Sequence, residues 1–97
     1  MELKKYLPLG SVVELKEGNK DLMIVGRLQR MKSTGEVFDY AACLYPEGLL
    51  DSTHFYLFNH RDIHLVRFLG LLDEQEIEYE QILFEEEERL KKDRTTA

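Results

Sequence analysis

The feature that most constrains the fold of this chain is a change of sequence pattern near residue 72. Before it, short apolar segments alternate with turn residues, which is typical of β-strands. After it, Asp73-Glu74-Gln75-Glu76 predicts a helix start with a capping box, and Leu72 and Ile77 would form a hydrophobic staple across it. We therefore expect a single domain, residues 1–97, with a sheet region (1–70) and an acidic C-terminal helix (71–94).

The predicted helix runs from about Glu74 to Lys92. Acidic residues gather in its first turns and basic residues in its last turn, which suits the helix dipole. Three pairs at four-residue spacing have the favourable order: Glu85/Arg89, Glu87/Lys91 and Glu88/Lys92. The glutamates at 85–88 are interpreted as a solvated face.

Five strands are predicted before the helix, over residues 11–16, 22–28, 37–45, 55–58 and 65–69. Their connections are too short for parallel crossovers, so the sheet should be mainly antiparallel. The segments 7–10 and 45–48, each with proline second and glycine fourth, predict type I turns, and Gly26 predicts a bulge or a close backbone approach. The expected fold is α+β: a mainly antiparallel curved sheet of about five strands, with an open barrel as one form it could take, followed by one long C-terminal helix.

Alternation within the strands indicates which side chains are buried. In residues 37–45 one face carries Phe38, Tyr40, Ala42 and Leu44. In residues 55–58 the alternation leaves two choices open, with either Phe55 and Leu57 or Tyr56 and Phe58 facing the core. Asn59, with Asp62 three residues later, predicts one helical turn before the last strand.

Charge and composition exclude several classes of protein. The chain is 43% hydrophobic and 33% charged, and its apolar runs are far shorter than the roughly 18 residues of a membrane span, so no membrane insertion is expected. The N-terminus lacks the apolar core of a signal peptide, so we expect a cytoplasmic location. Residues 1–70 carry nine basic and nine acidic residues, whereas residues 71–97 carry four and ten. Without a clustered basic field, nucleic acid is not an expected partner.

Patterns for catalysis and metal binding are weak. The histidines His54, His60 and His64 could form a zinc site with Cys43 or Asp62, but no CxxC or HExxH motif accompanies them. The chain has no nucleophile elbow and no glycine-rich phosphate loop. We therefore predict no catalytic residue, no cofactor and no metal, and expect that the protein is not an enzyme.

The predicted helix carries more apolar side chains than one face can bury. At 100° per residue Tyr79, Ile82, Leu83 and Leu90 fall in one sector, whereas Ile77 and Phe84 lie nearly opposite. In one interpretation, Ile77 completes the staple and Phe84 tucks under the sheet edge, which leaves no interface. In the other, which we favour, one set docks on the sheet and a protein partner covers the other. The predicted protein-binding residues are Ile77, Tyr79, Leu83 and Phe84, with Tyr56 and Phe58 as weaker candidates.

The chain also resembles a known family, through the segments 6–13 (YLPLGSVV), 22–27 (LMIVGR), 38–40 (FDY), 44–48 (LYPEG) and 58–63 (FNHRDI). It is similar, over about residues 6–76, to small proteins of unknown function encoded beside LXG toxin genes in type VII secretion loci of Gram-positive bacteria. The resemblance implies a non-enzymatic accessory protein that binds the helical LXG domain of a toxin and helps target it for export, alone or with other small helical accessory proteins. The alternative is an immunity protein that neutralises the toxin's effector domain.

These interpretations make the helix the interface and the sheet its support. Truncation after Gly70 is therefore expected to abolish toxin binding while residues 1–70 stay folded.

Overall fold

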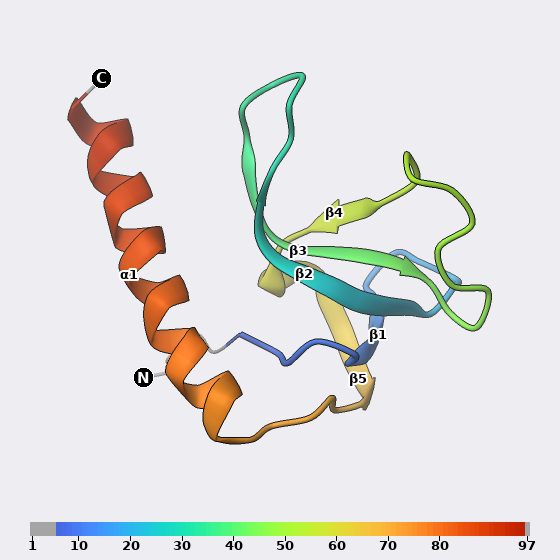
Figure 1. Ribbon diagram of the computed structural model, residues 1–97. Helices are drawn as coiled ribbons and strands as arrows, with labels where there is room; N and C mark the ends of the chain where they lie inside the picture. Colours follow the sequence, from blue (N-terminus) through green and yellow to red (C-terminus); the bar gives the residue numbers. More distant parts are fainter. Residues whose placement is uncertain (1–5, 97) are drawn as a thin grey trace.

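Five antiparallel strands and one long helix make up the fold in the computed structural model, which describes residues 6–96 (Figure 1). The strands are β1 (Val12–Leu15), β2 (Leu22–Arg30), β3 (Val37–Leu44), β4 (Tyr56–Phe58) and β5 (Ile63–Phe68). A short 3-10 helix, η1 (His60–Asp62), precedes β5, and the α-helix α1 (Glu74–Thr96) ends the described chain. The predicted α+β class, with a five-stranded antiparallel sheet followed by a C-terminal helix, is confirmed.

The sheet curves strongly because its two edges are joined by a very short segment. The strand order is β4-β3-β2-β1-β5, so β4 and β5 lie on opposite edges, yet residues 59–62 alone connect them. A flat five-stranded sheet would hold its outer strands about 19 Å apart, which is more than four residues wound largely into a 3-10 turn can span. Figure 1 shows the resulting curvature, and the sheet stays open because β4 and β5 do not pair within residues 6–96.

A bulge in β2 contributes to this curvature. Ile24 pairs with Ala42 but Gly26 pairs with Ala41, so Val25 is an extra residue on β2. Such a bulge bends a strand and increases its twist. Leu28, with a φ of 55°, adds a second irregularity in the same strand. The bulge predicted at Gly26 is confirmed.

The core lies between α1 and the sheet face that carries Ile24, Tyr40 and Phe58, which we call the inner face. Its buried side chains are Tyr6, Val13, Leu22, Ile24, Tyr40, Ala42, Phe58 and Leu83. The alternation predicted for residues 37–45 is confirmed for Tyr40, Ala42 and Leu44, which lie in the core or pack against it. Ala41 and Cys43, on the opposite face, are buried as well. In β4 it is Phe58 that faces inward.

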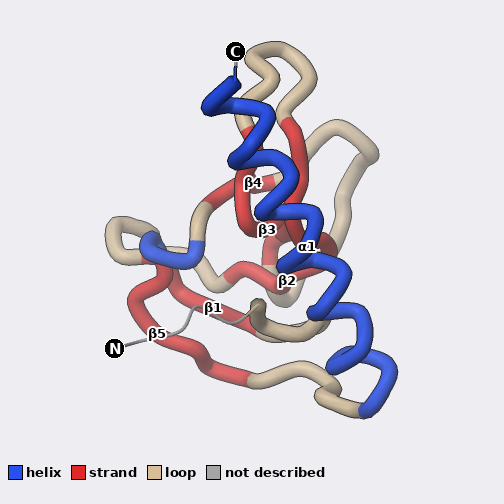
Figure 2. The backbone as a smooth tube through the Cα atoms, turned by 90° about the vertical axis from the view of Figure 1, so that its left-hand side faces the viewer, coloured by secondary structure: helices blue, strands red, loops and turns tan. Residues whose placement is uncertain are grey.

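Tyr6 links the helix to the sheet through aromatic contacts. Its ring centroid lies 6.2 Å from that of Tyr40 and 5.5 Å from that of Phe84 on α1. Its hydroxyl donates a hydrogen bond to a carboxylate oxygen of Glu87, at 2.8 Å. The Tyr6 side chain is therefore held between α1 and the inner face. Figures 1 and 2 show α1 running along one side of the sheet, with its C-terminal end pointing the same way as the β2–β3 turn.

Both predicted type I turns differ in the structure. At the first turn the Ser11 amide donates to the Pro8 carbonyl, at 3.2 Å, so the turn spans residues 8–11, one residue later than predicted. Gly10 then occupies the third position with a φ of 87°, as a type II turn requires. At the second turn the Gly48 amide donates to the Leu44 carbonyl, at 2.7 Å, which closes a wider turn than type I.

The start of α1 confirms half of the predicted capping box. The Asp73 carboxylate accepts a hydrogen bond from the Glu76 amide, at 3.0 Å, as an N-cap residue does. The Glu76 side chain, however, binds Arg27 on β2. The reciprocal half of the box is therefore wrong, because a distant cation competes for the same carboxylate.

Candidate protein-binding surface

A buried ion pair fixes the first turn of α1 to the sheet. The Arg27 guanidinium donates from Nη1 to Glu76 Oε2, at 2.6 Å, and from Nη2 to Glu76 Oε1, at 2.8 Å. Nη1 also donates to the Leu7 carbonyl, at 2.9 Å. The two side chains are 3% and 9% exposed. Arg27 thereby joins three segments of the chain that are far apart in the sequence.

The Tyr79 ring lies against the Arg27 guanidinium of this pair. The Arg27 guanidinium carbon lies 5.6 Å from the centroid of the Tyr79 ring, within the range of a cation–π contact. The ring itself remains 48% exposed. Tyr79 therefore presents a large, positioned aromatic surface next to the ion pair.

The face of α1 that docks on the sheet is more acidic than the sequence pattern predicts. Glu76, Leu83 and Glu87 lie on one stripe of the helix, at spacings of seven and four residues. Glu76 binds Arg27, Leu83 enters the core and Glu87 accepts from Tyr6. Tyr79 and Ile82, predicted to share a sector with Leu83, are instead 48% and 56% exposed.

The structure separates the six predicted binding residues into three groups. Leu83 and Phe58 are only 4% and 3% exposed and belong to the core, so a partner could not contact them on the folded protein. Phe84 is partly buried and packs against Tyr6. The other three remain at the surface, with exposed fractions of 55% for Ile77, 48% for Tyr79 and 42% for Tyr56.

Since Leu83 lies in the core, α1 is part of the folding unit rather than an addition to it. Truncation after Gly70 would remove this side chain. It would also remove Glu76, which binds Arg27, and Glu87, which binds Tyr6. We therefore expect a truncated sheet to be destabilised, contrary to the sequence prediction, and point substitutions are the better test of binding.

A groove of about 550 Å³ lies where the start of α1 meets β2, and we call it the α1 groove. It is lined by Leu9, Val25, Gly26, Arg27, Gln29, Leu71, Asp73, Gln75, Glu76 and Tyr79. Leu71 is 75% exposed and Leu9 is 50% exposed. Apart from Tyr79, its apolar walls come from residues that the sequence prediction did not include.

A close backbone contact holds two walls of the α1 groove together. The Gly70 amide donates to the Ser11 hydroxyl, at 2.9 Å, in a buried hydrogen bond. Gly70 also lies so close to the N-terminal turn that a Cβ atom there would be 2.0 Å from the Leu9 carbonyl oxygen. Only glycine fits this approach, which fixes the segment carrying Leu71 against the segment carrying Leu9.

A second hollow, of about 510 Å³, continues across the outer face of β2, β3 and β4. Its lining is Val25, Gly26, Gln29, Arg30, Met31, Lys32, Ala41, Thr53, Phe55 and Leu57. It shares Val25, Gly26 and Gln29 with the α1 groove. We call the two hollows together the outer trough.

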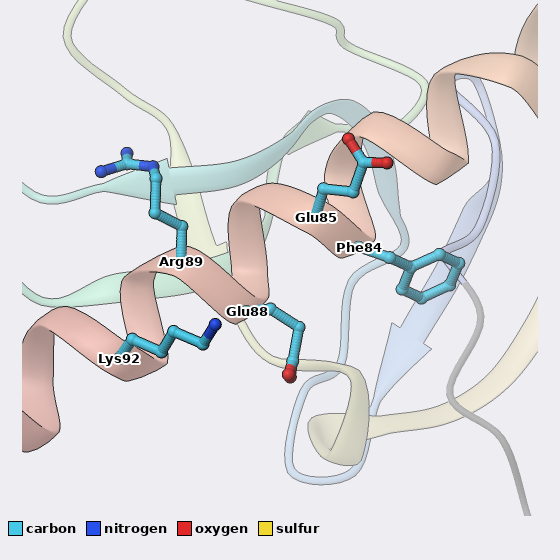
Figure 3. Close-up of a pocket in the computed structure, with 5 residues that line it drawn as sticks. All are labelled: Phe84, Glu85, Glu88, Arg89 and Lys92. Carbon is cyan, nitrogen blue, oxygen red and sulfur yellow. The ribbon is translucent and has the colours of Figure 1, made fainter.

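Other hollows have weaker claims to a binding role. One of about 380 Å³ beside the second half of α1 is lined by Phe84, Glu85, Glu88, Arg89 and Lys92. As Figure 3 shows, these side chains leave the same helix in different directions. Because all of its lining comes from one helix, the fold encloses nothing there.

The histidines have local roles in the structure. His60 Nδ1 lies 2.7 Å from the Tyr40 hydroxyl, and His54 Nδ1 lies 2.6 Å from an Asp51 carboxylate oxygen. His64 is exposed on β5, and Cys43 is buried. Among residues 6–96, no group of three His, Cys, Asp or Glu side chains is placed to hold a metal ion.

Two buried tyrosine hydroxyls have perturbed acidity. Burial raises the pKa of Tyr40 to about 12, although the hydrogen bond that its hydroxyl accepts from the Leu7 amide, at 3.0 Å, acts in the opposite direction. Burial, reinforced by the hydrogen bond to Glu87, raises the pKa of Tyr6 well above its usual value. Both hydroxyls are therefore neutral. Through their hydrogen bonds they connect α1 with Tyr6, and Leu7 with the sheet.

Within the described residues 6–96, no helix combines the length and the apolar character that crossing a membrane requires.

A family model described as a domain of unknown function (DUF4176) matches residues 6–79 of the chain. This span includes every residue that lines the outer trough. Searches of curated proteins and of solved structures found no significant match.

Proposed function

The chain belongs to the DUF4176 family of domains of unknown function, and we propose that it is a non-enzymatic accessory protein that binds the helical LXG domain of a type VII secretion toxin and helps target that toxin for export. The identity of the partner rests on the sequence resemblance described above. The binding role is supported by an unusual concentration of exposed apolar side chains around the start of α1.

This concentration is the observation that carries the proposal. In the segment before α1, Phe68, Leu69, Leu71 and Leu72 are 62%, 49%, 75% and 52% exposed. Leu9 and Tyr79 add to the same region as walls of the α1 groove. Full burial of one such side chain stabilises by about 1.5–3 kcal/mol, so covering several of them would supply substantial binding energy. Exposed apolar surface of this kind marks interaction sites in folded proteins.

Charge around the same region favours a basic partner surface. Asp73 lines the α1 groove, Glu74 and Glu78 are exposed on the first turns of α1, and residues 71–97 carry ten acidic against four basic residues. Such a rim steers a basic surface toward the apolar centre and adds specificity more than affinity.

The test is co-purification with the separate parts of a candidate toxin. The full chain is co-expressed with the isolated LXG domain or with the isolated effector domain of the toxin encoded beside it. We expect complex formation with the LXG domain, and loss of toxin from the culture supernatant when the accessory gene is deleted. Binding to the effector domain alone would favour the immunity function, and binding to neither would refute both.

A pair of matched variants connects the result to the structure. Leu71→Asp places a charge in the α1 groove, whereas Leu50→Asp places one at a similarly exposed leucine, 68% exposed, that does not line the outer trough. Since neither side chain belongs to the core, both variants should fold. Leu71→Asp should lose LXG binding and Leu50→Asp should retain it.

A further inference from the structure

We propose that the outer trough holds one amphipathic helix of the partner, with the basic end of that helix beside the start of α1 and its acidic end beside Arg30 and Lys32. This inference rests on the proposed function and adds to it the site, the secondary structure and the orientation of the bound segment.

The centre of the trough lies over strands whose backbone groups are paired with each other. Ala41 on β3 is paired with Gly26 on β2 and with Leu57 on β4. An extended peptide lying across Ala41 could not add to the sheet as a further strand, because β3 has no free edge at this residue. A segment that is buried in the trough must therefore satisfy its own backbone hydrogen bonds, which a helix does.

The floor of the trough is low at its centre. Gly26, Ala41 and Leu57 are cross-strand neighbours in register on β2, β3 and β4. The first two carry little or no side chain, and the Gln29 side chain folds over Gly26 while its amide donates to the Arg27 carbonyl, at 3.0 Å. Three strands span about 10 Å, which matches the diameter of one helix.

Apolar walls stand on both sides of this floor. On the α1 side are Leu9, Leu71 and Tyr79, and on the β4 side are Phe55 and Leu57. Val25, 40% exposed, lies between them and lines both hollows. A helix with an apolar stripe at three- and four-residue spacing could cover these side chains together.

The two ends of the trough carry opposite charge. At the α1 end the charges of Arg27 and Glu76 cancel each other, and Asp73 supplies the remaining negative charge of the lining. At the other end the charged lining residues are Arg30 and Lys32, both exposed. A bound helix whose charge runs from basic to acidic in the same direction would complement both ends, which sets its orientation.

The position of the site is tested by measuring the affinity of the full chain for the isolated LXG domain by calorimetry. Leu71→Asp and Phe55→Asp place a charge in opposite halves of the trough, and Leu50→Asp is the control outside it. We expect each trough variant to weaken binding at least about tenfold and the control to match the wild type. Thermal melts establish that each variant is folded. Unchanged affinity for either folded trough variant would overturn the inference.

The orientation is tested with charge changes of opposite sign. Gln75 lines the α1 end, so Gln75→Lys should weaken binding about threefold or more at low salt, while Gln75→Glu should not weaken it. Lys32→Glu should weaken binding more than Lys32→Gln, and both differences should shrink at high salt. The reverse pattern of signs would overturn the proposed orientation.

The outcomes separate this inference from the function on which it rests. If the wild type does not bind the LXG domain, the proposed function fails. If the wild type binds but the trough variants bind equally well, only the inference fails. Analytical ultracentrifugation of the protein alone covers one more outcome, because a dimer that Phe55→Asp abolishes would show that a second copy occupies the trough instead.

Discussion

Replacing Glu76 by glutamine should destabilise the fold far more than the same replacement elsewhere on α1. The substitution keeps the size of the side chain but removes the negative charge that faces the Arg27 guanidinium. Since both side chains are almost fully buried, water cannot take the place of the lost carboxylate.

The magnitude follows from the contacts that are lost. Two charge-assisted hydrogen bonds join the side chains, at 2.6 and 2.8 Å, and each such bond contributes about 1.5–3 kcal/mol. Arg27 keeps its bond to the Leu7 carbonyl, and glutamine can still accept one bond, so part of the loss is recovered. We expect the free energy of unfolding to fall by about 3–5 kcal/mol, the usual cost of breaking a buried pair.

Urea denaturation followed by circular dichroism measures this change. With a slope of about 1.5 kcal/mol per molar, the midpoint should fall by about 2–3 M. Glu86→Gln is the matched control, because Glu86 binds Arg89 on the same helix but is 42% exposed. Exposed pairs contribute little, so the control should leave the urea midpoint nearly unchanged.

The double variant Arg27→Met, Glu76→Leu provides the second half of the test. It removes both charges, so no buried ion is left unpaired and much of the lost stability should return. If Glu76→Gln costs no more than Glu86→Gln, the reasoning is refuted, because the pair would then be solvated rather than buried.

Two further predictions concern the elements that hold the groove in place. The pKa of Tyr40 is raised to about 12 in the folded protein, whereas the unfolded-state value is about 10. The stability linked to the neutral hydroxyl is therefore fully present below about pH 10. It falls by roughly 2–3 kcal/mol as the pH rises to about 12. Absorbance at 295 nm should show Tyr40→Phe losing one late-titrating group, and a native titration in which all five tyrosines have midpoints near pH 10 would contradict this. Gly70→Ala should cost about 2–3 kcal/mol, since the new Cβ atom would meet the Leu9 carbonyl at 2.0 Å. Urea midpoints measure this cost, with Gly18→Ala as the control, since a Cβ atom there would come no closer than 3.5 Å to its neighbours; equal losses would show that the backbone approach is not tight.

Features set by neighbouring residues could be predicted from the sequence. Asp73 caps α1, and the Asp62 carboxylate accepts from the Asn59 amide, at 2.9 Å, in the predicted turn before β5. The bulge at Gly26 and the inward face of β3 follow from glycine and from alternation. In each case the partners lie within a few residues of each other or on one strand, so the local pattern contains the information.

Features set by distant residues could not be predicted in the same way. Helical periodicity counts apolar residues, so it places neither Glu76 nor Glu87 against the sheet, although Arg27 and Tyr6 bind them. One signal was present: Arg27 follows an apolar run in a strand predicted to be central, and a buried charge requires a partner. Which of the many glutamates supplies that partner depends on how α1 crosses the sheet. The walls of the α1 groove were missed for the same reason, because they meet only in the folded chain.

The walls of the α1 groove come from the N-terminal turn, the second strand and the first turns of the last helix. A nascent chain still attached to the ribosome consequently lacks this surface until α1 has emerged and docked. Whatever binds there would recognise chains in which α1 is docked on the sheet and pass over chains that lack it, which makes capture of the partner a readout of this docking.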